Sequence, residues 1–156
     1  MTIFDSLFQL TPTVNRSGAD GIIQVEVTVR GITEFKGILF QAKKHGYRDR
    51  IRLEKQVVWM ETHSPGGSAV LIYGPDGYAA IKGKEYLSDA PETDLKVRRL
   101  LTLGQFFDEF LECTTGIRGM YYEAVRERLL LPTLDGQIRA VPLEVKSGIK
   151  IDIATA

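Results

Sequence analysis

A carboxylate, an amide and an ammonium group lie close together in the first third of the chain, on Asp20, Gln41 and Lys43. Asp20 directly precedes an alternating apolar run at residues 22–29, and Gln41 and Lys43 lie at the end of the next apolar run. Residues two apart on a strand share a face, so Gln41 and Lys43 point the same way while Ala42 points the other way. If the two runs pair as a hairpin, Asp20 lies beside this pair. Such a group suits a hard divalent cation and a water molecule to be activated.

Hydrophobic periodicity predicts the elements that must position these side chains. Strands are expected at residues 22–29, 37–42, 68–73, 78–81, 138–145 and 149–153, the last two as a strand pair. Helices are expected at 51–61, 102–114 and 120–131, with Thr102 as an N-cap. Residues 82–92 are expected to be irregular, and residues 1–10 form either a helix or an edge strand. This order predicts an α/β protein whose mixed central β-sheet is flanked by α-helices.

Length and composition indicate one domain over residues 1–156, with the candidate chemistry within 17–81 and helices and a strand pair within 102–153. Twenty basic residues balance twenty acidic ones, so affinity for nucleic acid must come from local clustering. The single cysteine, Cys113, cannot form an internal disulfide and is typical of a reducing compartment. No apolar stretch has the length of a membrane span and no signal peptide is visible, which favours a cytoplasmic protein without membrane contact.

The chain resembles the PD-(D/E)XK restriction-endonuclease-like nucleases, in the variant with Gln in place of the acidic residue of the E-x-K triplet. The resemblance rests on Gly18-Ala19-Asp20, on Leu39-Phe40-Gln41-Ala42-Lys43, on Leu53-Glu54-Lys55-Gln56, and on the order strand, turn, strand, helix. It covers roughly residues 17–80. It implies a restriction-endonuclease-like fold and metal-dependent hydrolysis of phosphodiester bonds in DNA, with RNA not excluded. The context it implies is microbial defence or DNA processing.

The resemblance also implies a role for each site residue. Asp20 would hold Mg²⁺ or Mn²⁺, and the Gln41 side-chain oxygen and the Ala42 backbone carbonyl would complete the protein's ligands. Lys43 would position the attacking water and stabilise charge that builds on the phosphate. Gln56, on the following helix, would steady the site or contact the DNA backbone.

This chain departs from the family's pattern in its acidic ligands. The family usually supplies a further carboxylate from an N-terminal helix, and Asp5 is the sole acidic residue before Asp20. Either Asp5 takes that role, or the site has fewer charged ligands, or this copy is inactive. Since Gln41 carries no charge, we expect weak metal affinity without Asp5. A catalytically silent subunit that binds nucleic acid or a protein partner is therefore the alternative function.

Basic residues cluster directly after Lys43, and they are candidates for contacts with a phosphate backbone. They are Lys44, Arg48, Arg50, Arg52 and Lys55. A solvated loop and helix start would have the same composition, so both interpretations stay open.

Two further features bear on the site and on partners. Asp135 with Glu144 and Lys146 matches the E-x-K letters better, but Pro142 interrupts that run and no helix follows it. The apolar stripe of Phe106, Phe107 and Phe110 packs in the core or at a homodimer interface. A partner protein of a defence system is a further expectation.

Overall fold

The computed structural model describes residues 18–88, 100–112, 115–145 and 147–155. Within them the protein is an α/β structure built on a seven-stranded mixed sheet of order β10-β1-β2-β3-β4-β5, with β6 paired to β2. Its strands are β1 (Gly21–Val29), β2 (Ile32–Lys44), β3 (Ser68–Gly74), β4 (Gly77–Lys82), β5 (Leu101–Thr102), β6 (Ile117–Arg118) and β10 (Ser147–Thr155). A second sheet has the order β7-β8-β9. It comprises β7 (Tyr121–Glu123), β8 (Arg128–Pro132) and β9 (Ile138–Pro142), with a 3₁₀ turn at Ala124–Arg126. The helices are α1 (Arg50–His63), α2 (Gly83–Ser88) and α3 (Leu103–Leu111).

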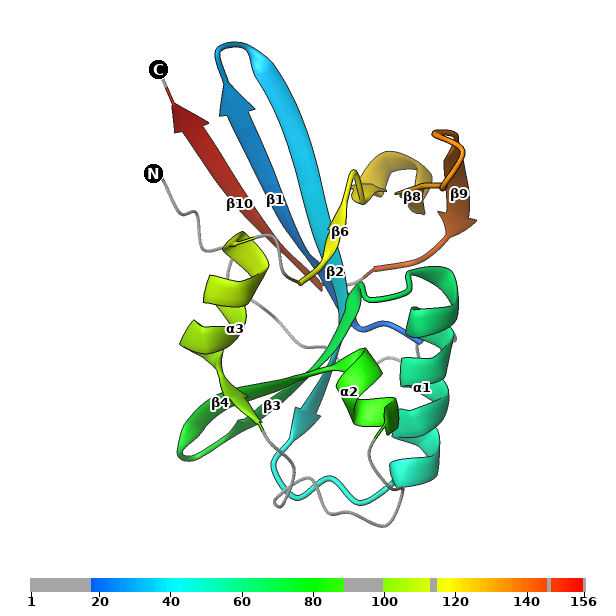
Figure 1. Ribbon diagram of the computed structural model, residues 1–156. Helices are drawn as coiled ribbons and strands as arrows, with labels where there is room; N and C mark the ends of the chain where they lie inside the picture. Colours follow the sequence, from blue (N-terminus) through cyan, green and yellow to red (C-terminus); the bar gives the residue numbers. More distant parts are fainter. Residues whose placement is uncertain (1–17, 89–99, 113–114, 146, 156) are drawn as a thin grey trace.

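Alternation along β2 separates two apolar layers, one on each face of the large sheet. Helices α1 and α3 lie on opposite sides of this sheet (Figure 1). Leu39 packs with Leu53 and Val57 of α1 and with Leu129 of the small sheet. On the opposite face, Phe40 packs with α3 residues that include the fully buried Phe106 and Phe110, while Phe107 packs against this layer from a partly buried position. The phenylalanine stripe therefore packs in the core of the chain.

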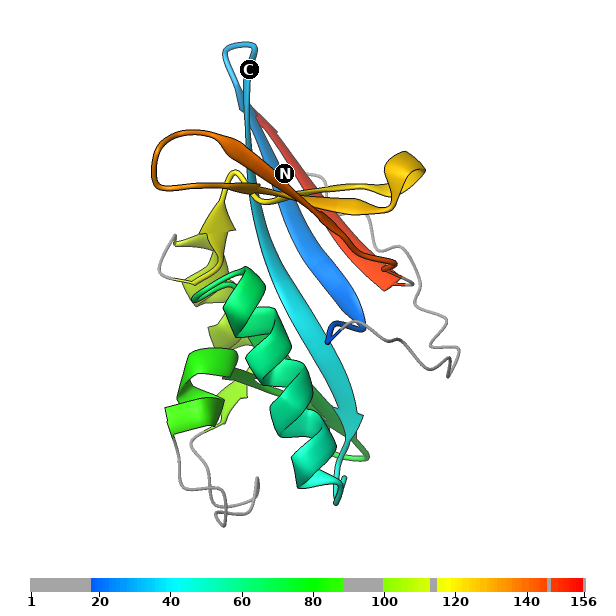
Figure 2. The same ribbon diagram turned by 90° about the vertical axis from the view of Figure 1, so that its right-hand side faces the viewer.

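The long central strand β2 organises the sheet. It pairs antiparallel with β1 through a two-residue turn, Arg30 and Gly31, whose φ angles of 50° and 77° match the turn type that twisted hairpins prefer. On its other side it pairs parallel with β3, and α1 provides the connection between the two strands. Because β2 and β3 are parallel, their carboxyl ends meet at the same end of the sheet as the start of α1 (Figures 1 and 2).

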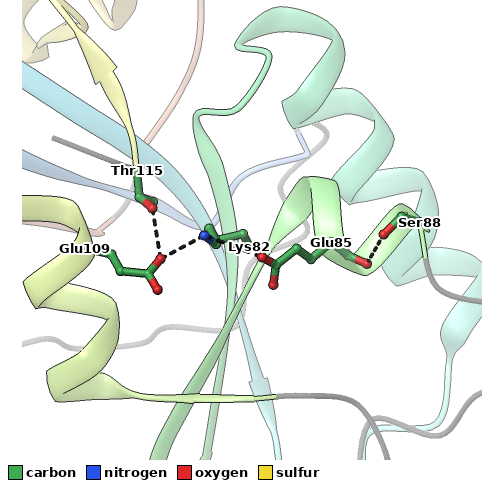
Figure 3. Close-up of polar contacts among 5 residues, drawn as sticks. All are labelled: Lys82, Glu85, Ser88, Glu109 and Thr115. Carbon is green, nitrogen blue, oxygen red and sulfur yellow. Dashed lines mark hydrogen bonds and ion pairs between the residues drawn. The ribbon is translucent and has the colours of Figure 1, made fainter.

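Helix α3 begins where the sequence predicts. The Thr102 side chain accepts a hydrogen bond from the Gln105 N–H at 3.1 Å, and the Gln105 side chain accepts one from the Thr102 N–H at 2.9 Å, which is a capping box. An ion-pair group joins this helix to β4 and α2: Lys82 lies 2.8 Å from Glu109 and 3.5 Å from Glu85, and the Thr115 hydroxyl donates to Glu109 (Figure 3). The hydrogen bond to Glu109 raises the pKa of Lys82.

The structure corrects the expectation for residues 120–131, which form strands β7 and β8 instead of a helix. Leu129 and Leu131 are buried while Leu130 between them is only partly so, which is strand alternation. The Tyr122 N–H donates to the Gln24 side chain of β1 at 3.0 Å, so pairing and burial outweigh the helix propensity of this segment. A single helix, α3, is therefore described within residues 102–153.

The structure departs less from the other secondary-structure expectations. The strands expected at 138–145 and 149–153 form, but as β9 paired with β8 and β10 paired in parallel with β1, so they are not a strand pair. Part of the region expected to be irregular forms α2. The expectations for residues 1–10, for Asp5 and for Cys113 fall outside the described residues. No helix in the described part of the chain is long and apolar enough to cross a membrane.

We predict that Gly18→Ala destabilises the fold. A Cβ at Gly18 would lie 2.5 Å from the Gln56 carbonyl oxygen and 2.7 Å from the Trp59 Cβ, so the chain must move away from α1. Overpacking of this kind costs about 1–3 kcal/mol of unfolding free energy, measured by urea denaturation. Gly104→Ala is the matched control, because its Cβ would meet no atom closer than 3.9 Å and alanine favours the helix. Equal stability of the two variants would contradict the close contact at Gly18.

Candidate active site

The candidate site lies at the carboxyl end of β2, where β1 begins. The Asp20 N–H donates to the Phe40 carbonyl at 2.8 Å, and the Ala42 N–H donates to the Asp20 carboxylate at 2.9 Å. Since β1 starts at Gly21, which pairs with Phe40, the last residues of β2 extend beyond β1 and Asp20 lies at their open side. The structure therefore brings Asp20 to the Gln-x-Lys segment, as the sequence predicts.

Gln41 is fully buried on the face of β2 that is covered by α1. Its amide nitrogen donates to the Gly18 carbonyl at 2.5 Å. Its other amide atom, Oε1, is buried and has no hydrogen-bond partner among the described residues. A buried acceptor without a partner costs free energy, so this oxygen is suited to a ligand, a cation or a water molecule.

Lys43 lies two residues further along the same face and is half-buried. Its ammonium is 4.7 Å from the centre of the Tyr47 ring, in cation–π geometry. Burial lowers the pKa of Lys43. The negative charge of Asp20 raises this pKa, the positive charge of Arg52 lowers it, and the negative charge of Asp49 raises it. Lys43 is therefore within electrostatic reach of Asp20 on one side and of the start of α1 on the other.

Gln56 approaches the site from α1. Its backbone carbonyl packs against Gly18, whose own carbonyl accepts the hydrogen bond from Gln41. The Gln56 Oε1 is also buried and has no hydrogen-bond partner among the described residues. Gln56 therefore adds a second buried amide oxygen that could bind a cation or a water, on a helix residue whose backbone contacts Gly18.

The oxygen ligands at this site suit a hard divalent cation, although together they carry little negative charge. Asp20 supplies a carboxylate and Gln41 a buried amide oxygen that needs a partner. On a strand, the backbone N–H and C=O of one residue point toward the same neighbouring strand. The Ala42 N–H donates to Asp20, so the Ala42 carbonyl also points toward Asp20. Among the residues that the structure describes, no group of three or more His, Cys, Asp or Glu side chains could hold a metal. The described site therefore has fewer charged ligands than a typical Mg²⁺ centre, and Asp5 stays untested.

The basic cluster follows β2 and continues into the first turns of α1. All of its side chains are exposed: Lys44, Arg48, Arg50, Arg52 and Lys55. Arg52 is close enough to Lys43 to affect its pKa, so the cluster borders the site. An extended anion such as a phosphate backbone could contact both at once.

The alternative triplet is not brought together. Asp135 lies in the turn between β8 and β9, where Thr133 donates a hydrogen bond to its carboxylate and lowers its pKa. Glu144 follows the opposite end of β9 and lies outside any strand, and Lys146 falls outside the described residues. Asp135 and Glu144 therefore do not form a site with each other.

Tyr47 and Asp49 are neighbours of the site that the sequence analysis did not assign to it. Tyr47 lies below the Lys43 ammonium, and burial raises the pKa of its hydroxyl. Asp49 accepts a hydrogen bond from the Arg52 N–H at 3.0 Å and so caps α1. An Asp before a helical run is a readable N-cap signal, whereas nothing in the sequence spacing indicates the ring contact of Tyr47.

Comparisons with protein-family models, with curated proteins and with solved structures found no match to this chain. Functional conclusions therefore rest on the residues and their geometry alone.

We predict that Lys43→Met stabilises the protein at neutral pH. The folded-state pKa of Lys43 lies below its ordinary value, so the charged form is disfavoured by folding. This cost is fully present at neutral pH, shrinks as pH rises through the folded-state pKa, and vanishes above the pKa of the unfolded chain. The midpoint of thermal unfolding should rise for Lys43→Met, and the gain should decrease toward alkaline pH. Lys44→Met, which replaces an exposed lysine, should change little, and a lower midpoint for Lys43→Met would contradict the account.

Proposed function

We propose that this protein is a metal-dependent phosphodiesterase that cleaves DNA, a restriction-endonuclease-like enzyme of the Gln-x-Lys variety. The observation that carries the proposal is the convergence of the Asp20 carboxylate, the buried Gln41 amide oxygen and the half-buried Lys43 ammonium at the end of the central strand. The exposed basic cluster beside them supports a polyanionic substrate. A cytoplasmic role in defence or DNA processing is part of the proposal.

Each residue has a defined task in this reaction. Asp20, the Gln41 Oε1 and the Ala42 carbonyl would hold Mg²⁺ or Mn²⁺, which would supply a polarised phosphate and an activated water. Lys43 hydrogen-bonds the attacking water or a phosphate oxygen and stabilises the charge of the transition state. Because its pKa is lowered, Lys43 is a better proton donor than an exposed lysine. The basic cluster holds the strand by its phosphates.

A catalytically silent subunit with the same fold is the second candidate. The specific observation that favours it is that, among the residues that the structure describes, no group of three or more His, Cys, Asp or Glu side chains could hold a metal ion. This candidate predicts salt-sensitive binding of nucleic acid and no cleavage with any divalent metal.

The direct test incubates the protein with plasmid, linear duplex and single-stranded DNA in Mg²⁺ or Mn²⁺, with a chelator control. We expect Lys43→Ala and Asp20→Asn each to lower the cleavage rate by about 100-fold or more, since each removes a group that acts in the transition state or holds the cation. Gln41→Glu adds a second carboxylate but loses the hydrogen bond to the Gly18 carbonyl that positions Asp20, so it should lower the cleavage rate as well.

Glu144→Gln and Lys146→Ala are the controls for this test and should leave cleavage unchanged. Loss of cleavage in these controls would transfer the active site to the C-terminal triplet. A wild-type protein that binds DNA but cleaves none with either metal would establish the silent subunit.

Replacement of Arg48, Arg50 and Arg52 together by Gln should weaken binding to all DNA sequences about equally. The dependence of log affinity on log salt should become shallower by about 0.9 for each phosphate contact that is lost. Arg118, Arg126 and Arg139 are exposed arginines elsewhere, and their combined replacement by Gln removes the same charge. Fluorescence anisotropy titrations over a range of salt concentrations measure both variants. If the two variants lose the same DNA affinity, the net charge of the protein determines binding and the position of the basic cluster does not.

A further inference from the structure

Strand β10 forms one edge of the large sheet (Figure 1). One side of it pairs with β1 in a regular register along all nine residues, and no described strand pairs with its other side. An edge strand presents backbone N–H and C=O groups to any strand that approaches it. Edge strands are commonly short or bulged, which prevents such pairing, so the long and regular β10 is suited to a partner strand.

One face of β10 is apolar up to this edge. Ile151 is buried in the layer that contains Phe106, and Ile149 and Ile153 pack against this layer from partly buried positions. Ile153 also lines a groove of about 310 Å³, whose other apolar residues include Val25, Val27 and Leu111. A strand that added isoleucines beside these three would extend the apolar layer and remove more of its surface from water.

The opposite face of β10 has a charge pattern that complements itself. Lys150 and Asp152 alternate with the isoleucines, and the Lys150 ammonium lies 3.0 Å from Glu26 of β1 and 3.2 Å from Asp152. Asp152 is the direct neighbour of Glu26 in the β1–β10 register, so two carboxylates lie side by side and share the Lys150 ammonium. A further ammonium on the open side of Asp152 would therefore be favourable.

We propose that two copies of this chain pair through β10 in antiparallel orientation and form a homodimer with one continuous sheet. A two-fold axis at Ile151, the middle residue of Ser147–Thr155, aligns the two strands over their full length. In this register Lys150 of each copy lies opposite Asp152 of the other, and Ile149 lies opposite Ile153. The second copy thus supplies both the ammonium and the isoleucines that the edge favours. The interface goes beyond the proposed function and does not depend on it.

The test is the oligomeric state of the full chain, measured by sedimentation velocity over a range of protein concentrations. The wild type should sediment as a dimer, with twice the chain mass of 17.5 kDa, and dissociate on dilution. Asp152→Lys places lysines opposite each other at two symmetric positions, so the dissociation constant should rise by about 10-fold or more. Within one chain the same change puts an ammonium beside Glu26, so the fold should be retained, as circular dichroism checks.

A charge reversal separates the interface from a general effect of charge. Lys150→Asp combined with Asp152→Lys restores opposite charges across the axis, so the dissociation constant should return to within about 3-fold of the wild-type value. Asp76→Lys makes the same charge change at an exposed turn residue and should leave the dissociation constant unchanged. A wild type that is monomeric at every concentration, an unweakened dimer in Asp152→Lys, or no recovery in the double variant would each overturn the proposed interface.

Discussion

The hydrogen bond from the Gln41 side chain to the Gly18 carbonyl is the contact on which the candidate site depends. It attaches the segment before β1 to the end of β2, and two further hydrogen bonds of Asp20 complete the attachment. The segment reaches this position because Gly18 has no side chain to collide with α1. With its nitrogen engaged by Gly18, the Gln41 amide must keep its oxygen as an acceptor, buried and without a partner among the described residues. One interaction thus positions Asp20 and leaves a buried oxygen available to a ligand.

Under the proposed function, the charges around this oxygen would let a neutral protein bind a polyanion at one end of its sheet. Lys43 and Arg52 lie close to Asp20, and the other basic side chains of the cluster are exposed nearby. A single carboxylate holds a divalent cation weakly, but a phosphate that enters the site brings oxygen ligands and negative charge of its own. In the proposed reaction the cation and the nucleic acid would contact each other, and any gain in affinity that one gives the other would be reciprocal.

The sequence predicted the relative positions of Asp20, Gln41 and Lys43 better than it predicted the fold around them. Alternation along 22–29 and 37–42 was enough to place Gln41 and Lys43 on one face and Asp20 beside them, because the hairpin that joins the two strands is local in sequence. The parallel pairing of β10 with β1 joins residues as distant as Ile23 and Ile149, and no local pattern specifies such a partner. The helix expected at 120–131 failed for a related reason, since its strands are stabilised by Gln24 and by the core beneath them. Tyr47 was missed because its contact with Lys43 depends on how the loop after β2 turns back.

The most direct test of the central claim is paramagnetic broadening of backbone amide resonances by Mn²⁺, with no nucleic acid present. If Asp20 and the Gln41 oxygen form the cation site, dilute Mn²⁺ should broaden first the signals of Gly18, Asp20 and residues 41–43, and excess Mg²⁺ should restore them. Asp20→Asn should remove the effect at these residues. Broadening that begins at Asp135 or Glu144 while the Gln41 signals stay sharp would contradict the account.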